Sequence, residues 1–119
     1  MKVINIDGDE YIRKEDVFVP AEELGGMEYC MVRSYSAGVF AGYVEKRDGK
    51  EVTLRNARRI WSWDGAASLS QLATDGTSKP ENCKFPCEVN KVILTEVIEI
   101  ISISEKAKES IAEVEVWEE

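Results

Sequence analysis

Two alternating runs joined by a tight turn constrain the fold of this chain more than any other feature. The first run is VFAGYVEK at residues 39–46, the second is EVTLRN at residues 51–56, and Asp48 and Gly49 stand between them. An Asp-Gly pair readily adopts the backbone conformation of a tight turn between antiparallel strands. The pattern therefore predicts a β-hairpin in the middle of the chain.

Further strands are expected on both sides of this hairpin. EYCMVRSYS alternates, so that Tyr29 and Met31 share one face and Cys30 and Val32 the other, and we expect one face to pack while the other presents polar groups. The β-branched run VILTEVIEIISIS predicts a central strand or a pair of strands buried on one face. ARRIWSW at residues 57–63 predicts a strand, and VEVW near the end predicts an edge strand.

Helix signals are short. Ser68 to Ala73 predicts a helix that ends near Gly76, and Ser104 is a good N-cap for a second helix. Pro20 followed by two glutamates predicts a single helical turn before Gly25. The expected fold class is α+β: a mainly antiparallel sheet with two or three short helices in one domain spanning residues 1–119, with an N-terminal arm at 1–27 and a core at 28–117.

Composition narrows the classes of function. The 119 residues contain no histidine, which removes Ser-His and Cys-His nucleophile pairs, histidine-ligated metals and the commonest general base. We therefore expect a protein that is not an enzyme and that needs no cofactor or metal. Three cysteines cannot all pair within the chain and are expected to be reduced, and no long apolar run predicts a membrane span. The chain is expected to be soluble and cytoplasmic.

Charge is distributed unevenly along the chain. Residues 33–63 carry a net charge of +4, whereas residues 1–32 carry −5 and residues 64–119 carry −7. A long polyanion such as DNA or RNA would be repelled by most of the surface. The distribution favours a small phosphorylated ligand over an extended nucleic acid.

The strand ARRIWSW supplies the strongest candidate binding residues. Alternation places Arg59, Trp61 and Trp63 on one face and Arg58 on the other, so only one of the two arginines faces a given side. Guanidinium groups bind phosphate through planar donors, and indole rings stack on nucleobases. Alternatively, the tryptophans belong to the core and the arginines pair with the many carboxylates.

Weaker candidates lie in three other segments. In GAASLSQL, a helix start with small residues and hydroxyls favours an anion, although the same residues form an ordinary turn and N-cap. RSYSAGVFAG is suited to a tight contact with a ligand or with a neighbouring subunit, and an aromatic and an amide in CKFPCEVNK are suited to base recognition or to core and turn roles. The candidates from these segments are Arg33, Ser36, Ser68, Ser70, Gln71, Phe85 and Asn90.

Several blocks resemble a known family. RSYSAGVFAG, NARRIW, GAASLSQLA, CKF and ILTEVIEI, within about residues 29–117, resemble a small group of phage and prophage proteins. The chain is similar to the first class of Thoeris anti-defence proteins, phage sponges that bind cyclic ADP-ribose isomers and, in some members, cyclic oligonucleotides. The resemblance implies α+β protomers that assemble and hold the signal without cleaving it in the cytoplasm of the infected bacterium.

The same resemblance implies roles for individual residues. Arg58 and Arg59, with Arg33 as a weaker candidate, would bind phosphates, while Phe85, Trp61 or Trp63 would stack on the base. The polar contacts would be completed by Ser68, Ser70 and Gln71. The expected partner is thus a small cyclic nucleotide bound by a homo-oligomer.

Two rival functions fit the same sequence. An acidic inhibitor would bind a bacterial defence protein directly through carboxylates such as Glu113 and Glu115, in the manner of a nucleic-acid mimic. A nucleotide-cleaving enzyme would bind the same ligand and release products. Charge reversal at the carboxylates separates the first rival from a sponge, and the state of the recovered ligand separates the second.

Overall fold

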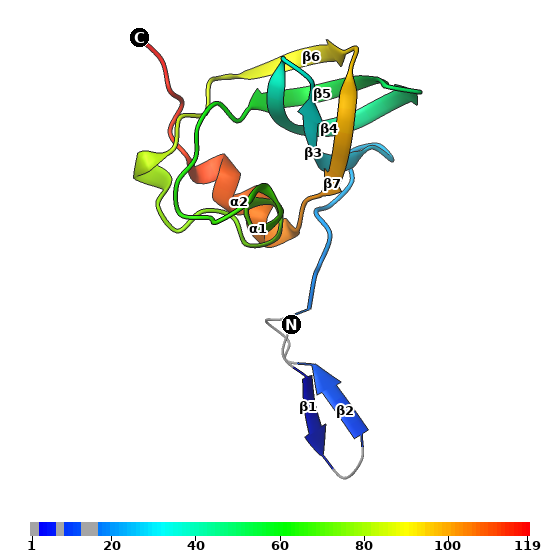
Figure 1. Cartoon of the computed structure of the whole chain (residues 1–119), viewed down its shortest axis with the longest axis vertical. Coiled ribbons are helices and arrows are strands. Elements are labelled where there is room, and N and C mark those ends of the chain that lie inside the picture. Colours follow the sequence, from blue (N-terminus) through cyan, green and yellow to red (C-terminus); the bar gives the residue numbers. More distant parts are fainter. Residues whose placement is uncertain (1–2, 7–8, 13–16) are drawn as a thin grey trace.

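The computed structural model describes residues 3–6, 9–12 and 17–119 (Figure 1). Residues 1–2, 7–8 and 13–16 of the expected N-terminal arm lie outside this described part. The strands are β1 (Val3–Ile6), β2 (Asp9–Ile12), β3 (Glu28–Ser34), β4 (Gly38–Asp48), β5 (Glu51–Arg59), β6 (Glu88–Leu94) and β7 (Val97–Ser102). The helices are α1 (Leu69–Asp75), the 3₁₀ turn η2 (Pro80–Asn82) and α2 (Glu105–Glu113).

An antiparallel sheet of five strands forms the body of the protein, with the strand order β6-β5-β4-β3-β7. The predicted hairpin is confirmed, because β4 ends at Asp48 and β5 begins at Glu51 with Gly49 at a φ of 61° between them. Strands β1 and β2 pair separately as a two-stranded antiparallel hairpin. The described chain thus contains more sheet than helix, in outline as predicted.

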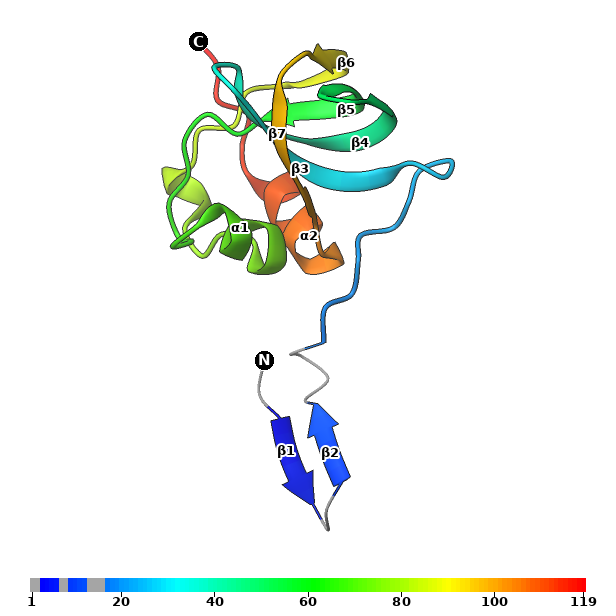
Figure 2. The same cartoon turned by 45° about the vertical axis from the view of Figure 1, so that its right-hand side comes forward.

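The two edge strands of the sheet follow one another in the sequence. Only Thr95 and Glu96 separate β6 from β7, although these strands occupy opposite edges. So short a connection requires the sheet to curl until its edges approach each other, as the turned view shows (Figure 2). Two backbone bonds fix the connection: Tyr35 N–H donates to the Glu96 carbonyl and Val97 N–H to the Lys50 carbonyl, each at 2.9 Å.

Residues on both faces of the central strands β3, β4 and β5 are buried. An inner cluster fills the concave side, and an outer cluster packs between the convex side and the helices. On β3, Cys30 and Val32 belong to the inner cluster and Tyr29 and Met31 to the outer one. The predicted alternation is confirmed, but the expectation that one of these faces presents polar groups is wrong, because helices cover one side and the curl of the sheet encloses the other.

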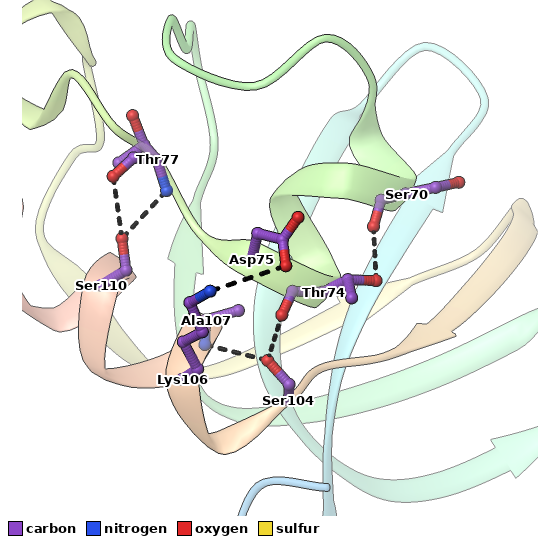
Figure 3. Close-up of polar contacts among 8 residues, drawn as sticks. All are labelled: Ser70, Thr74, Asp75, Thr77, Ser104, Lys106, Ala107 and Ser110. Atoms are coloured by element: carbon purple, nitrogen blue, oxygen red, sulfur yellow. Dashed lines mark hydrogen bonds and ion pairs between the residues drawn. The ribbon is translucent and has the colours of Figure 1, made fainter. Parts of the chain in front are cut away.

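Both predicted helix starts are confirmed, and the helices are joined by hydroxyl bonds (Figure 3). Ser68 accepts from the Gln71 N–H, and Ser104 accepts from the Ala107 N–H at 3.0 Å while donating to the Thr74 carbonyl of α1 at 2.6 Å. Side chain–backbone bonds of this kind satisfy the free N–H groups at a helix start. Ser104 therefore caps one helix and fixes its position against the other.

The predicted helical turn at Pro20 is wrong. Pro20 instead forms an isolated bridge with Ser104, and the Ala21 N–H donates to the Ile103 carbonyl at 2.9 Å. The Glu22 N–H donates to a carboxylate oxygen of Glu105, also at 2.9 Å. Backbone partners from the far end of the chain hold this segment extended, which its local proline and glutamate pattern could not indicate.

Three strand predictions are correct only in part. The strand through ARRIWSW ends at Arg59, after which Ser62 forms a single bridge with Lys84. At VEVW the chain makes one bridge, Phe85 with Val116, instead of an edge strand. VILTEVIEIISIS does form a pair of strands, but β6 and β7 lie at opposite edges of the sheet. These segments position the tryptophans described below.

Candidate functional site

Arg58 and Arg59 are consecutive on β5 and face opposite sides of the sheet. Arg58 lies across from Ala41, a member of the outer cluster, whereas Arg59 lies across from Phe40, a member of the inner cluster. The predicted alternation is therefore confirmed at these positions. It gives the two arginines different partners and different chemistry.

Arg58 is a structural residue. Only 7% of it is exposed, and its guanidinium donates to the carbonyls of Pro86, Ile111, Phe85 and Val114 at 2.7–3.1 Å. Two of these carbonyls, those of Ile111 and Val114, stand at the C-terminus of α2, where the helix dipole is negative. Burial lowers the pKa of Arg58 from its ordinary value. Its expected role in phosphate binding is wrong, because these donors already serve the fold.

Arg59 is only half-buried and is much less committed. Its guanidinium lies over the Phe40 ring, 4.2 Å from the centroid, and Nη1 donates to the Ala37 carbonyl. Within the described residues it makes no other side-chain hydrogen bond and no carboxylate lies within ion-pair distance of it. A guanidinium has five N–H donors, so Arg59 keeps donors for a ligand.

Two hollows meet at Arg59, and we call their combined lining the Arg59 surface. The first, of about 230 Å³, is lined by Ser36, Ala37, Gly38, Val39, Arg59, Ile60, Trp61 and Trp63. The second, of about 380 Å³, is lined by Phe40, Ala57, Arg59, Pro86, Cys87, Val89, Lys91 and Val92. Four sequence-predicted residues, namely Ser36, Arg59, Trp61 and Trp63, therefore come together in one place.

A pair of stacked tryptophans stands beside the first hollow. Trp61 is 62% exposed, and its ring is stacked with that of Trp117 at a centroid separation of 6.2 Å and an interplanar angle of 15°. The ammonium of Lys84 lies 5.5 Å from the centroid of the Trp117 ring. Exposed indole faces next to cations can receive a planar, anionic ligand.

The remaining candidates lie elsewhere. Arg33 pairs with Glu99 at 3.1 Å on the surface. Phe85 is fully buried in the outer cluster, so its expected role in stacking on a base is wrong. Asn90 is exposed on the edge strand β6 and lines neither hollow. Sequence patterns identified these residue types but not which of them would be exposed beside Arg59.

The predicted anion site at the start of α1 is occupied by the helix itself. The Ser68 hydroxyl accepts from the Gln71 N–H at 3.1 Å, and the Gln71 side-chain oxygen accepts from the Ala67 N–H at 2.7 Å. Ser70 is exposed on the helix and lines neither hollow. The helix has only seven residues. These residues close a reciprocal cap, which is the alternative that the sequence left open.

Several residues of this region carried no sequence signal. Trp117 reaches Trp61 because Val116 bridges Phe85 and the Trp117 N–H donates to the Phe85 carbonyl at 3.0 Å. Lys91 and Cys87 reach the second hollow through the pairing of β6 with β5. Such juxtapositions depend on long-range pairing, which a local pattern does not contain.

Fold and site together define a small antiparallel-sheet protein with a basic, aromatic surface. In the described residues there is no group of three or more His, Cys, Asp or Glu side chains that could hold a metal ion. No helix in the described part of the chain is long and apolar enough to cross a membrane.

A comparison with protein families assigns the chain to one of them. Residues 27–111 match the family described as a domain of unknown function, DUF6948, and the chain belongs to this family. No curated protein and no solved structure matches the chain.

Proposed function

We propose that this protein binds a small phosphorylated nucleotide at the Arg59 surface and holds it without cleaving it. The observation that carries the proposal is the position of Arg59. Its guanidinium retains uncommitted donors among the described residues, lies where two hollows meet, and has the exposed Trp61 beside it. One surface therefore provides both a guanidinium that can bind phosphate and an aromatic ring on which a base can stack.

The chemistry of each group supports this ligand class. A guanidinium binds two phosphate oxygens through parallel donors, and Lys91 in the second hollow adds a positive charge. Trp61 offers an exposed indole face, and a base stacked on such a face gains roughly 1–3 kcal/mol. The Phe40 ring beneath Arg59 holds the guanidinium in place.

The resemblance to phage sponges narrows the proposal further. It suggests a cyclic ADP-ribose isomer or a cyclic oligonucleotide made by bacterial immunity, bound in the cytoplasm of an infected cell. The acidic flanks of the chain favour such a compact ligand over DNA or RNA. Sequestration requires tight binding and no proton transfer, which agrees with a sequence that lacks histidine.

Self-association would multiply the binding sites. Val89 and Ile93 on the edge strand β6 are 40% and 52% exposed, and Val89 also lines the second hollow. A homo-oligomer formed along this edge would cover these side chains and deepen the hollow. Light scattering during size-exclusion chromatography would give the mass, and a monomer at micromolar concentration would contradict this part of the proposal.

Isothermal titration tests the ligand. We expect heat with a cyclic ADP-ribose isomer or with a cyclic di- or trinucleotide, and Arg59→Ala should weaken binding about ten- to a hundredfold. Trp61→Ala should weaken it about fivefold to a hundredfold. Arg33→Ala is the matched control, since its guanidinium is exposed and paired with Glu99. Absence of heat with every nucleotide would overturn the proposal.

The two rival functions give different results. Chromatography of the ligand released by heat-denaturing the protein should recover it intact, whereas products would show an enzyme. If the protein acts instead as an acidic inhibitor, charge reversal at the exposed Glu113 and Glu115 would abolish protection of a phage in infected cells. Under the nucleotide proposal the loss follows Arg59→Ala instead.

A further inference from the structure

A separate cavity of about 350 Å³ lies between α2 and the convex face of the sheet. Figure 2 shows α2 against this side of strands β3 to β5. The lining residues are Tyr29, Tyr43, Asn56, Arg58, Glu88, Lys108, Ile111, Ala112 and Val116. None of them belongs to the Arg59 surface. This volume is within the range of pockets that hold small molecules.

Tyr29 presents an unsatisfied polar group to this cavity. The residue is 8% exposed and its ring contacts that of Tyr43 at a centroid separation of 4.9 Å. Within the described part of the chain, no group forms a hydrogen bond with the Tyr29 hydroxyl. Buried hydroxyls nearly always have a partner, from the protein, from water or from a ligand. The Tyr29 hydroxyl is therefore available to a molecule in the cavity.

The same wall carries a cation. The ammonium of Lys108 lies 5.5 Å from the centroid of the Tyr29 ring and 5.3 Å from that of Tyr43. A hydrogen bond with Tyr43 raises the pKa of Lys108, and burial raises the pKa of Tyr29 well above its ordinary value. Lys108 therefore stays charged and Tyr29 stays protonated at neutral pH, so that both are donors.

The charged and polar groups around the cavity restrict which ligands can bind there. Donors come from the hydroxyls of Tyr29 and Tyr43, the Lys108 ammonium and the Asn56 amide, whereas Glu88 contributes the one carboxylate among the lining residues. Arg58 lines the cavity too, but four backbone carbonyls occupy its guanidinium. One anionic group can pair with Lys108, and a second negative charge would meet Glu88. The remaining lining residues, Ile111, Ala112 and Val116, are apolar.

We propose that this cavity is a second binding site, for a small organic monocarboxylate with an apolar body. The carboxylate accepts from the Lys108 ammonium and from the Tyr29 hydroxyl, and the apolar part lies against Ile111 and Val116. The two sites share no lining residue, so this proposal does not rest on the proposed function.

Nuclear magnetic resonance titration of the whole protein with phenylacetate tests the proposal. We expect saturable shifts of the Tyr29 and Lys108 amides at millimolar probe, and weaker shifts with the neutral phenylacetamide or the dianionic phenyl phosphate. Shifts confined to other residues, or absent with phenylacetate, would overturn the site. Stronger binding of phenyl phosphate would overturn the assignment of a single negative charge.

Variants identify the groups that bind. Lys108→Met should weaken phenylacetate binding about tenfold or more, and Tyr29→Phe about threefold to tenfold. Lys106→Met is the control, since Lys106 is on the same helix but pairs with Asp75 at 3.8 Å and does not line the cavity. Unchanged binding in both cavity variants would overturn the proposal.

A stability measurement distinguishes a binding hydroxyl from a structural one. Tyr29→Phe removes the hydroxyl and keeps the ring, so the thermal midpoint of the ligand-free protein should stay the same or rise. A clear fall would show that the hydroxyl has a partner in the fold and would overturn the proposal. The Tyr29→Phe variant should still bind nucleotide at the Arg59 surface as the wild type does. Nucleotide titration of this variant therefore distinguishes failure of the cavity proposal from failure of the proposed function.

Discussion

Arg58 and Arg59 are chemically identical neighbours with opposite roles. Backbone carbonyls of residues 85–86 and of the end of α2 enclose the Arg58 guanidinium. The Arg59 guanidinium instead lies on the Phe40 ring, where two hollows meet. One side chain holds the fold together and the other is available to a ligand. The difference comes entirely from the face of β5 on which each residue lies, so charge alone does not identify a binding arginine.

A bulge in β5 sets this arrangement. Tyr43 lies across from Arg55, but Ala41 lies across from Arg58, so Asn56 and Ala57 together face Gly42. Asn56 has a φ of 49°, in the left-handed region that asparagine tolerates better than most residues. An extra residue at a bulge changes which side chains face each side of the sheet. The bulge thereby determines which arginine is buried.

The largest effect should come from removing the buried guanidinium. Arg58→Met should lower the free energy of unfolding by about 3 kcal/mol or more, because four backbone carbonyls each lose a charged donor. Lysine should recover only part of the loss, since its ammonium is a point charge and not a planar fork. Urea unfolding measures both variants, with Arg33→Met as the exposed control. A loss below about 1 kcal/mol would show that Arg58 is not structural.

Disturbing the bulge should have the next largest effect. A Cβ at Gly42 would lie 3.1 Å from the Ala57 Cα and 3.2 Å from the Arg55 carbonyl oxygen, closer than most Cβ contacts. Gly42→Ala should therefore cost about 1–3 kcal/mol and move both arginines. Urea unfolding and amide chemical shifts of residues 55–59 would measure this. Wild-type stability with unchanged shifts would contradict the role of the bulge.

Removing the second arginine should affect stability least. Arg59→Ala should lower the free energy of unfolding by less than about 1 kcal/mol, since it loses a cation–π contact with Phe40 and one hydrogen bond to a backbone carbonyl. The same urea experiment measures this value next to that of Arg58→Met. Equal losses for the two variants would remove the distinction between a structural and a binding arginine.

Thiol labelling reports on the Arg59 surface without changing stability. Cys87 is exposed and lines the second hollow, whereas Cys30 and Cys83 are buried. Burial, and to a smaller extent the nearby Glu28 carboxylate, raises the pKa of the Cys30 thiol to about 12. This thiol therefore stays protonated and unreactive at pH 7–9.

Mass spectrometry after brief maleimide treatment should therefore find one label, at Cys87. A bound nucleotide should slow this reaction, because it would occupy the hollow that Cys87 lines. A Cys87→Ser variant should remain unlabelled in its native state. Labelling at Cys30 before unfolding, or an equal rate with saturating ligand, would contradict the expected protection.

Local signals in the sequence predicted the local parts of the fold. The Asp48–Gly49 turn and the caps at Ser68 and Ser104 involve contacts within a few residues, and alternation placed Arg58 and Arg59 on opposite faces. Each of these features depends on backbone preference or on strand geometry, which neighbouring residues determine.

What the sequence could not indicate depends on distant partners. The segment at Pro20 is extended because the backbone at residues 103–105 binds it, and Trp117 meets Trp61 through a bridge near Phe85. The burial of Arg58 could not be predicted for the same reason, since the carbonyls that accept from it lie 27 to 56 positions further along the chain. The candidate site was thus identified by residue type and completed by tertiary pairing.

The connection between β6 and β7 also constrains the order in which the chain can assemble. Strands β3 to β6 follow one another and can pair as they leave the ribosome, but β7 pairs with β3, which lies more than sixty positions earlier in the chain. Until residue 102 has been made, one edge of β3 has no neighbouring strand, and unpaired edges promote association with other chains. Synthesis of β7 therefore protects β3, the strand with which this sheet begins.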